Sequence, residues 1–130
     1  MKLNNQTKLY LQISSLLMAL AISIGAFGAH GLKPYLDDYG IIIYTKATTY
    51  EFYMTLGLFV ISFISIFIQN SKKIKISFYL ILYGMLIFSF SLYILAISKI
   101  MWLGAITPIG GSLMIIGWIV LFFAIKNDTK

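Results

Sequence analysis

The sequence predicts an all-α membrane protein, a bundle of four transmembrane helices. Hydrophobic residues make up 60% of the 130-residue chain and charged residues only 11%. Soluble proteins carry about 25% charged residues, so this chain has too few charges to cover a surface that faces water. We therefore expect one membrane domain over residues 1–130.

Four apolar stretches approach the length of about 20 residues that a helix needs to cross a membrane. None shows the alternation of apolar and polar residues over about ten positions that marks a transmembrane β-strand. Backbone groups in lipid must be paired within the protein, so helices are the structure that remains. We expect these helices over residues 9–30, 47–69, 76–97 and 108–125.

The first stretch also has features of a secretory signal peptide, because Lys2 and Lys8 precede an apolar run that ends in small residues. Its apolar part is about 20 residues long, whereas the core of a signal peptide has about 7–15 residues. This length favours a retained transmembrane helix.

The lysines predict the orientation in the membrane. With the N-terminus inside, seven lysines lie on the inner side and three on the outer side. The positive-inside rule then places both termini in the cytoplasm, in a multi-pass protein of the inner (cytoplasmic) membrane. The inner lysines are Lys2, Lys8, Lys72, Lys73, Lys75, Lys126 and Lys130, and the outer ones are Lys33, Lys46 and Lys99.

The first outer loop, Leu32 to Lys46, is the longest connection. Its apolar and charged residues fall on opposite faces of a helix, which predicts a short interfacial helix. Pro34 stands near the expected start of that helix and Gly40 at its end.

Composition excludes several kinds of function. The chain has no cysteine, so it has no disulfide and no thiol chemistry, and its single histidine excludes a multi-histidine metal centre. The net charge of +6 comes from lysines that flank apolar runs, so membrane anchoring explains it better than nucleic-acid binding. We expect no nucleic-acid partner, no cofactor and no bound metal.

His30 and Glu51 are the first candidates for a functional pair, because each lies near the outer end of its predicted helix. If the second helix begins at Ala47, Glu51 lies only ~6 Å along it, at the depth of the membrane interface. The sequence then favours two helix-end polar residues that complement the helix dipoles. A functional polar pair stays open as the alternative.

Small residues form two stripes at helical spacing. Ala21, Gly25 and Ala29 lie on one face of the first helix, and Gly110 and Gly117 on one face of the fourth. Such stripes let helix backbones approach closely in lipid, so we expect helix-packing seams. A substrate path along these stripes is the alternative.

Several short motifs together resemble a known family. Gly25–Leu32 closes the first helix, Tyr50–Leu56 opens the second, Phe88–Tyr93 lies in the third, and Thr107–Gly111 with the Gly117–Trp118 pair lies in the fourth. Their order and spacing resemble domain-of-unknown-function family 423, also called uncharacterised protein family 0382. The resemblance covers nearly the whole chain.

This resemblance implies a bacterial inner-membrane protein with four spans and no established biochemical activity. The chain departs from the family pattern at three positions. The pattern has Gln where this chain has Glu51, His where it has Met54, and Gly where it has Phe90.

The resemblance also implies a set of recurring residues at the outer helix ends. Together with Glu51, we expect them to form one polar-aromatic patch near the outer interface. The other residues are His30, Tyr50, Tyr53, Ser89, Ser91, Tyr93, Thr107 and Pro108.

The leading interpretation is a structural or accessory membrane protein, associating with itself or with another membrane protein. Its support is the small-residue stripes and the expected lack of a buried charge. The alternative is a small-solute or ion transporter or channel subunit that acts as an oligomer, which would usually carry an acid inside the membrane. A lipid-directed enzyme is the weakest interpretation, because the lone histidine has no metal cluster or paired carboxylate beside it.

Overall fold

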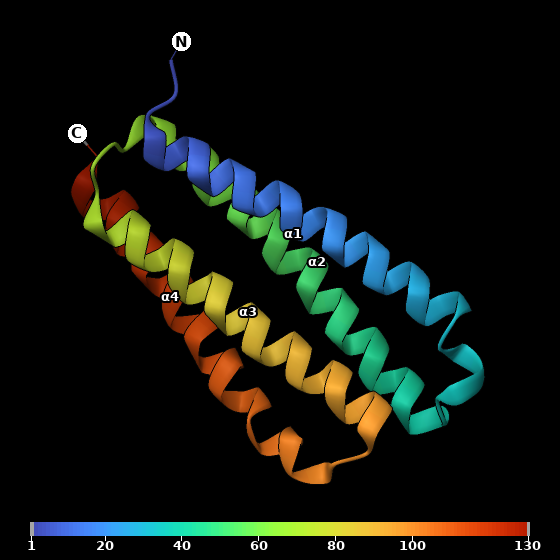
Figure 1. Cartoon of the computed structure of the whole chain (residues 1–130). Helices are drawn as coiled ribbons and strands as arrows, with labels where there is room; N and C mark the ends of the chain where they lie inside the picture. The colour runs from blue at the N-terminus through green and yellow to red at the C-terminus, as the bar shows by residue number, and fades with distance from the viewer. Residues whose placement is uncertain (1, 130) are drawn as a thin grey trace.

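Four long antiparallel helices dominate the computed structural model, which describes residues 2–129 (Figure 1). Within these residues, all four are long and apolar enough to cross a membrane. A 3₁₀ turn lies between the first two helices, η1 (Lys33–Tyr35), and another between the last two, η2 (Met101–Ala105). Lys130, which the lysine count includes, lies outside the described residues. The helices are α1 (Asn5–His30), α2 (Asp38–Phe67), α3 (Lys72–Ser98) and α4 (Thr107–Asp128).

The two ends of the bundle differ in what they carry. Both chain termini and the short α2–α3 turn lie at one end, which we call the terminal end (Figure 1). The α1–α2 and α3–α4 connections, with η1 and η2, lie at the other end, which we call the loop end (Figure 1).

Side-chain caps fix three of the four helix starts. Asn4 accepts a hydrogen bond from the backbone N–H of Thr7, and Ser71 accepts one from Ile74. At the start of α2, Asp37 accepts one from the backbone N–H of Gly40. Such caps satisfy backbone donors that the first turn of a helix leaves free.

The start of α2 corrects the sequence prediction. We expected this helix from residue 47, but the Asp37 cap starts it at Asp38. Gly40 does not end an interfacial helix: it lies in the first turn of α2, where an added Cβ would lie 3.2 Å from the Ala96 backbone oxygen. The short helix of the first loop is therefore only the single turn η1.

The core is centred on α3, which has the largest buried share of the four helices. It packs between α2 and α4, while α1 packs mainly on α2. Phe78, Ile81 and Met85 of α3 are fully buried, and the Phe78 ring stacks on Tyr10 of α1 with centroids 4.1 Å apart. Many large apolar side chains of α1 and α4 are exposed, as expected for surfaces that face lipid tails.

Glycines bring α3 and α4 into backbone contact. A Cβ added at Gly110 would lie 2.5 Å from the Phe88 backbone nitrogen and 2.6 Å from the Gly84 oxygen. A Cβ at Gly117 would lie 2.6 Å from Cγ1 of Ile81. Only glycine permits this approach, and we call Gly84, Gly110 and Gly117 the glycine seam.

Candidate functional site

A group of buried polar side chains lies between α2 and α3. Glu51 has no exposed surface, and the hydroxyl of the buried Tyr93 donates a hydrogen bond to its Oε1 at 2.7 Å. The same hydroxyl lies 3.1 Å from Oγ1 of Thr48. Thr55, also fully buried, follows one turn after Glu51. We call Thr48, Glu51, Thr55 and Tyr93 the Glu51 cluster.

Helix geometry explains why these residues meet. Thr48, Glu51 and Thr55 are three and four residues apart, so they share one face of α2. Helical side chains lean toward the N-terminus of their own helix. Because α2 and α3 are antiparallel, Glu51 leans toward the loop end and Tyr93 toward the terminal end, and their polar tips come together.

Two polar atoms of the cluster have no partner. Oε2 of Glu51 and Oγ1 of Thr55 are buried and make no hydrogen bond among the described residues. A buried polar group without a partner costs about 1–3 kcal/mol, and more if it is charged. The cluster is therefore maintained at a cost to stability.

Glu51 lies much farther along its helix than the sequence suggested. It is the fourteenth residue of the thirty-residue helix α2, so its Cα is ~20 Å along a helix ~45 Å long. The expected position ~6 Å along the helix is wrong, because the cap at Asp37 starts the helix nine residues before Ala47. An ionisable side chain buried near the middle of a spanning helix is costly and marks a functional site by default.

Tyr44 joins α1 to the cluster. Its hydroxyl donates to the Ile24 backbone oxygen at 2.6 Å, and its ring centroid lies 4.7 Å from that of Tyr93. A Cβ added at Gly28 would lie 2.0 Å from the Tyr44 ring, so only glycine leaves room for this ring. Thr48 in turn donates to the Tyr44 backbone oxygen at 3.1 Å.

A cavity of about 390 Å³ lies beside the cluster, between α1 and α2. Its lining runs from Lys33 in η1 to Thr45, Thr48 and Thr49 on α2. This volume is within the range of about 300–1,000 Å³ that small-molecule sites occupy. Thr48 lines the cavity and also contacts Tyr93, so it connects the cavity to Glu51.

The structure divides the expected polar-aromatic patch. Glu51, Tyr93 and Ser89 lie at the α2–α3 interface, where the Ser89 hydroxyl donates to the Ala47 backbone oxygen at 2.9 Å. Ser91 and Thr107 pair separately across α3 and α4, with hydroxyls 2.7 Å apart. These five patch residues therefore fall into two separate groups, one buried between α2 and α3 and one partly buried between α3 and α4.

The remaining patch residues lie on the surface. Tyr53 is 63% exposed, and Tyr50 is 40% exposed with its ring 4.7 Å from that of Phe88. His30 and Pro108 are exposed at the ends of α1 and α4. The structure thus does not combine the exposed His30 with the buried Glu51.

The small residues of α1 differ among themselves in burial. Ala21 is fully buried, a Cβ at Gly25 would lie 3.2 Å from Cγ2 of Thr48, and Ala29 is exposed. The fourth-helix pair, Gly110 and Gly117, lies in the glycine seam.

Sequence reasoning missed several residues of this region: Tyr44, Thr48, Thr55 and Gly84. The first three share the face of α2 that carries Glu51, and this spacing is visible in the sequence once the helix is extended to Asp38. No comparable sequence signal marks Gly84, which is a single glycine in an apolar run.

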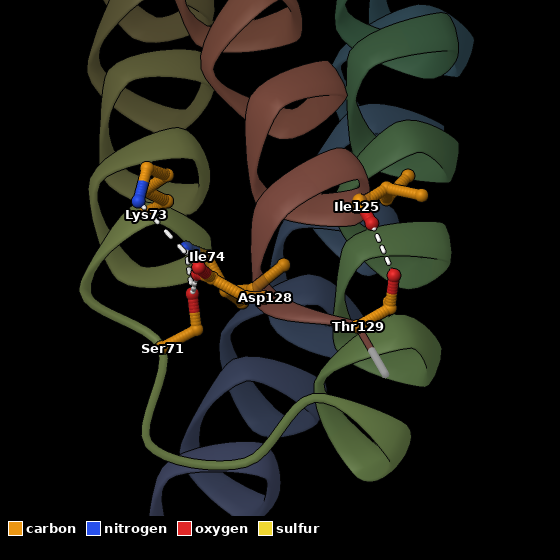
Figure 2. Close-up of polar contacts among 6 residues, drawn as sticks. All are labelled: Ser71, Lys73, Ile74, Ile125, Asp128 and Thr129. Atoms are coloured by element: carbon orange, nitrogen blue, oxygen red, sulfur yellow. Dashed lines mark hydrogen bonds and ion pairs between the residues drawn. The ribbon is translucent and has the colours of Figure 1, made fainter.

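The terminal end carries an exposed polar contact of a different kind (Figure 2). The Ser71 hydroxyl donates to the Asp128 carboxylate, and the Lys73 ammonium lies 3.5 Å from the same group. These contacts connect the α2–α3 turn to the end of α4. Exposed ion pairs of this kind contribute little to stability.

Comparison with known proteins identifies the family. Residues 24–111 match the family model described as protein of unknown function (DUF423). The chain is 45% identical over 119 residues to a UPF0382 membrane protein of Staphylococcus epidermidis, covering 90% of this chain and 94% of that protein. It is 37% identical over 117 residues to one of Bacillus subtilis, covering 90% and 95%. No solved structure matches. The chain thus belongs to the DUF423 (UPF0382) family of bacterial multi-pass membrane proteins.

Proposed function

We propose that this chain is a subunit of an oligomeric ion transporter or channel, and that the ion is the proton, bound and released by Glu51. One observation carries the proposal. Glu51 is fully buried near the middle of α2, and its Oε2 makes no hydrogen bond among the described residues.

The chemistry of a buried carboxyl supports this role. A carboxylate without a charged partner is very costly in an apolar interior, whereas the protonated acid is not. The two ion pairs of the described residues, Lys73 with Asp128 and Lys99 with Asp37, lie at the ends of the bundle. Binding or release of a proton at Glu51 would therefore change the free energy of the α2–α3 interface, which is what a coupled transporter requires.

The cavity between α1 and α2 supports access from the loop end. It extends from Lys33 to Thr48. The Thr48 hydroxyl contacts the Tyr93 hydroxyl, which in turn donates a hydrogen bond to Glu51. A proton arriving as hydronium would leave water behind, and the carboxylate would become a neutral acid. Release on the other side reverses the step.

A structural or accessory role, alone or with another membrane protein, is the rival proposal. The sequence favoured it on the small-residue stripes and on the expected lack of a buried charge, and the burial of Glu51 removes the second of these reasons. The family resemblance implies Gln at this position, so our proposal concerns this chain rather than all its relatives. We expect no enzymatic activity, since the single histidine lies exposed at the end of α1.

Glu51→Gln is a sharp test, because glutamine keeps the shape of a neutral carboxyl but binds no proton in its place. In proteoliposomes with a potassium diffusion potential, we expect proton uptake reported by an internal pH dye. Glu51→Gln abolishes this uptake, and Asp38→Asn, which removes an exposed acid of the same helix, leaves it unchanged. Absence of uptake in the wild type, or equal uptake in Glu51→Gln, would favour the accessory role.

We further propose that both termini face the cytoplasm, with seven lysines inside and three outside. The chain has no cysteine, so single cysteines can be introduced at exposed turns without background. A membrane-impermeant maleimide applied to intact cells should label Ala105→Cys and leave Gln69→Cys unlabelled. The opposite pattern would reverse the orientation.

A further inference from the structure

The buried polar face of α2 continues past Glu51 toward the terminal end. Thr55 and Ser62 have no exposed surface and Ser65 has almost none. They follow Glu51 at four, eleven and fourteen residues, so all lie on one face of the helix. Polar groups are thus buried along most of the length of α2.

Helix α1 places polar groups opposite this face in a fixed register. Thr7 pairs with Ser65, their hydroxyls 2.7 Å apart, and near the loop end Gly28 faces Tyr44. In both pairs the residue numbers add to 72, so the same register holds at the two ends of the interface. This register places Tyr10 of α1 at the same height along the bundle as Ser62 of α2.

The register also fills the longest gap in the polar face of α2. Between Thr55 and Ser62 that face carries Leu58, and Ser14 of α1 lies level with it. Ser14 is fully buried and donates to the Tyr10 backbone oxygen at 2.8 Å. Buried hydroxyls from both helices therefore occur at successive levels from Glu51 to the terminal end. We call Thr55, Ser14, Tyr10, Ser62, Thr7 and Ser65 the polar path.

Two hydroxyls of the polar path have no partner. Oγ1 of Thr55 and the phenol oxygen of Tyr10 are buried and make no hydrogen bond among the described residues, and Oε2 of Glu51 shares this property. Oγ1 of Thr55 lies one helical turn after Glu51, and the Tyr10 ring stacks on Phe78 of α3. Buried polar groups are hydrogen-bonded in nearly all proteins, and ordered water is the partner where the protein offers none.

We propose that the polar path binds a chain of water molecules that conducts protons between Glu51 and the terminal end. The proposal rests on the proposed function, since Glu51 supplies or accepts the proton. The neutral acid gives its proton to the first water, each water passes one proton to the next, and a hydronium ion leaves at Thr7 and Ser65. Glu51 is left as the carboxylate and takes its next proton from the loop-end cavity.

The test compares neighbouring serines of α1 that differ in burial. Ser14 is buried and Ser15 is exposed, yet each donates to the carbonyl four residues earlier at 2.8 Å. In proteoliposomes we expect Ser14→Ala to lower proton flux about tenfold, the change in rate that loss of one hydrogen bond to the water chain corresponds to. Ser15→Ala leaves flux unchanged. Thr55→Val, similar in size, lowers it by a comparable factor.

A second measurement separates this inference from the proposed function. The infrared carbonyl band of protonated Glu51, identified by its loss in Glu51→Gln, is followed against pH in each variant. If Glu51 titrates and Ser14→Ala and Thr55→Val conduct like the wild type, the water path is overturned while proton binding stands. If the wild type shows no such band at any pH, both proposals fall. Thermal unfolding in detergent confirms that each variant is folded.

Discussion

The two sides of α3 are built in opposite ways. Toward α4, glycines let the backbones approach so closely that a Cβ at Gly110 would lie 2.5 Å from the Phe88 nitrogen. Toward α2, the contact is made by polar side chains, with Tyr93 reaching Glu51 across the interface. The α3–α4 interface has no room for a methyl group at Gly110. The α2–α3 interface holds buried polar atoms that have no hydrogen-bond partner among the described residues.

This difference follows from lipid as the solvent. Apolar side chains gain little by leaving lipid for a helix interface, so stability comes from close van der Waals contact, which small residues permit. The glycine seam provides this close contact between α3 and α4. Unpartnered polar atoms at α2 weaken the bundle, so stability does not explain them.

The largest expected effect is on the glycine seam. Gly110→Ala should destabilise the bundle by roughly 2–3 kcal/mol, because the new Cβ meets backbone atoms of α3 that cannot move independently. Unfolding by denaturing detergent in mixed micelles measures this loss in the free energy of unfolding.

The adjacent glycine is the matched control. A Cβ at Gly111 would have its nearest contact at 3.8 Å, on the Phe88 ring, so Gly111→Ala should be neutral or stabilising by up to about 1 kcal/mol through helix propensity. Equal losses in the two variants would show that the seam is not what holds α4.

Tyr93→Phe should come second, at about 1–2 kcal/mol, because it leaves both carboxyl oxygens of Glu51 without a hydrogen-bond donor. Tyr83→Phe, on an exposed part of the same helix, is the control. In the Glu51→Gln background the loss should change, since the interaction is between these two residues. Strictly additive losses would contradict a direct Tyr93–Glu51 bond.

Ser77→Ala should have a smaller effect, about 0.6–1 kcal/mol. The Ser77 hydroxyl donates to the Gly117 backbone oxygen at 2.8 Å, a polar contact inside the α3–α4 interface. Ser98→Ala, an exposed serine at the end of α3, serves as reference. A loss as large as that of Gly110→Ala would mean that this hydrogen bond, and not close packing, dominates the interface.

The smallest effect concerns pH at the loop end. The Gly40 backbone N–H, which donates to Asp37, and the nearby Lys99 ammonium hold the pKa of Asp37 below its ordinary value of 3.8. A carboxyl with a lowered pKa in the folded state stabilises the fold above its ordinary pKa and loses this effect as pH falls through the folded value.

Asp37→Asn keeps an acceptor for the cap but removes the charge. Its stability should therefore change less than that of the wild type when the pH is lowered from about 5 to about 2. Detergent unfolding at several pH values measures this. Identical pH dependence in the two proteins would show that Asp37 does not contribute.

Particular residues show how far sequence reasoning reached. The apolar runs identified four spans, and the motifs around Gly25–Leu32 and Thr107–Gly111 identified the family. Glu51 and Tyr93 were both candidates, but as members of a surface patch. The position of Glu51 along α2 depends on where this helix begins, and Asp37, which caps that start, was assigned to a loop.

The sequence alone determined that this chain spans a membrane with four helices, because hydropathy and span length are properties of each segment by itself. Tertiary structure decided which residues meet. The single glycine at 84 joins the seam only because Gly110 lies opposite it, and Ser14 fills a gap in α2 only through the register of α1. Such pairings depend on how one helix is placed against another, and periodicity along one helix does not contain that information.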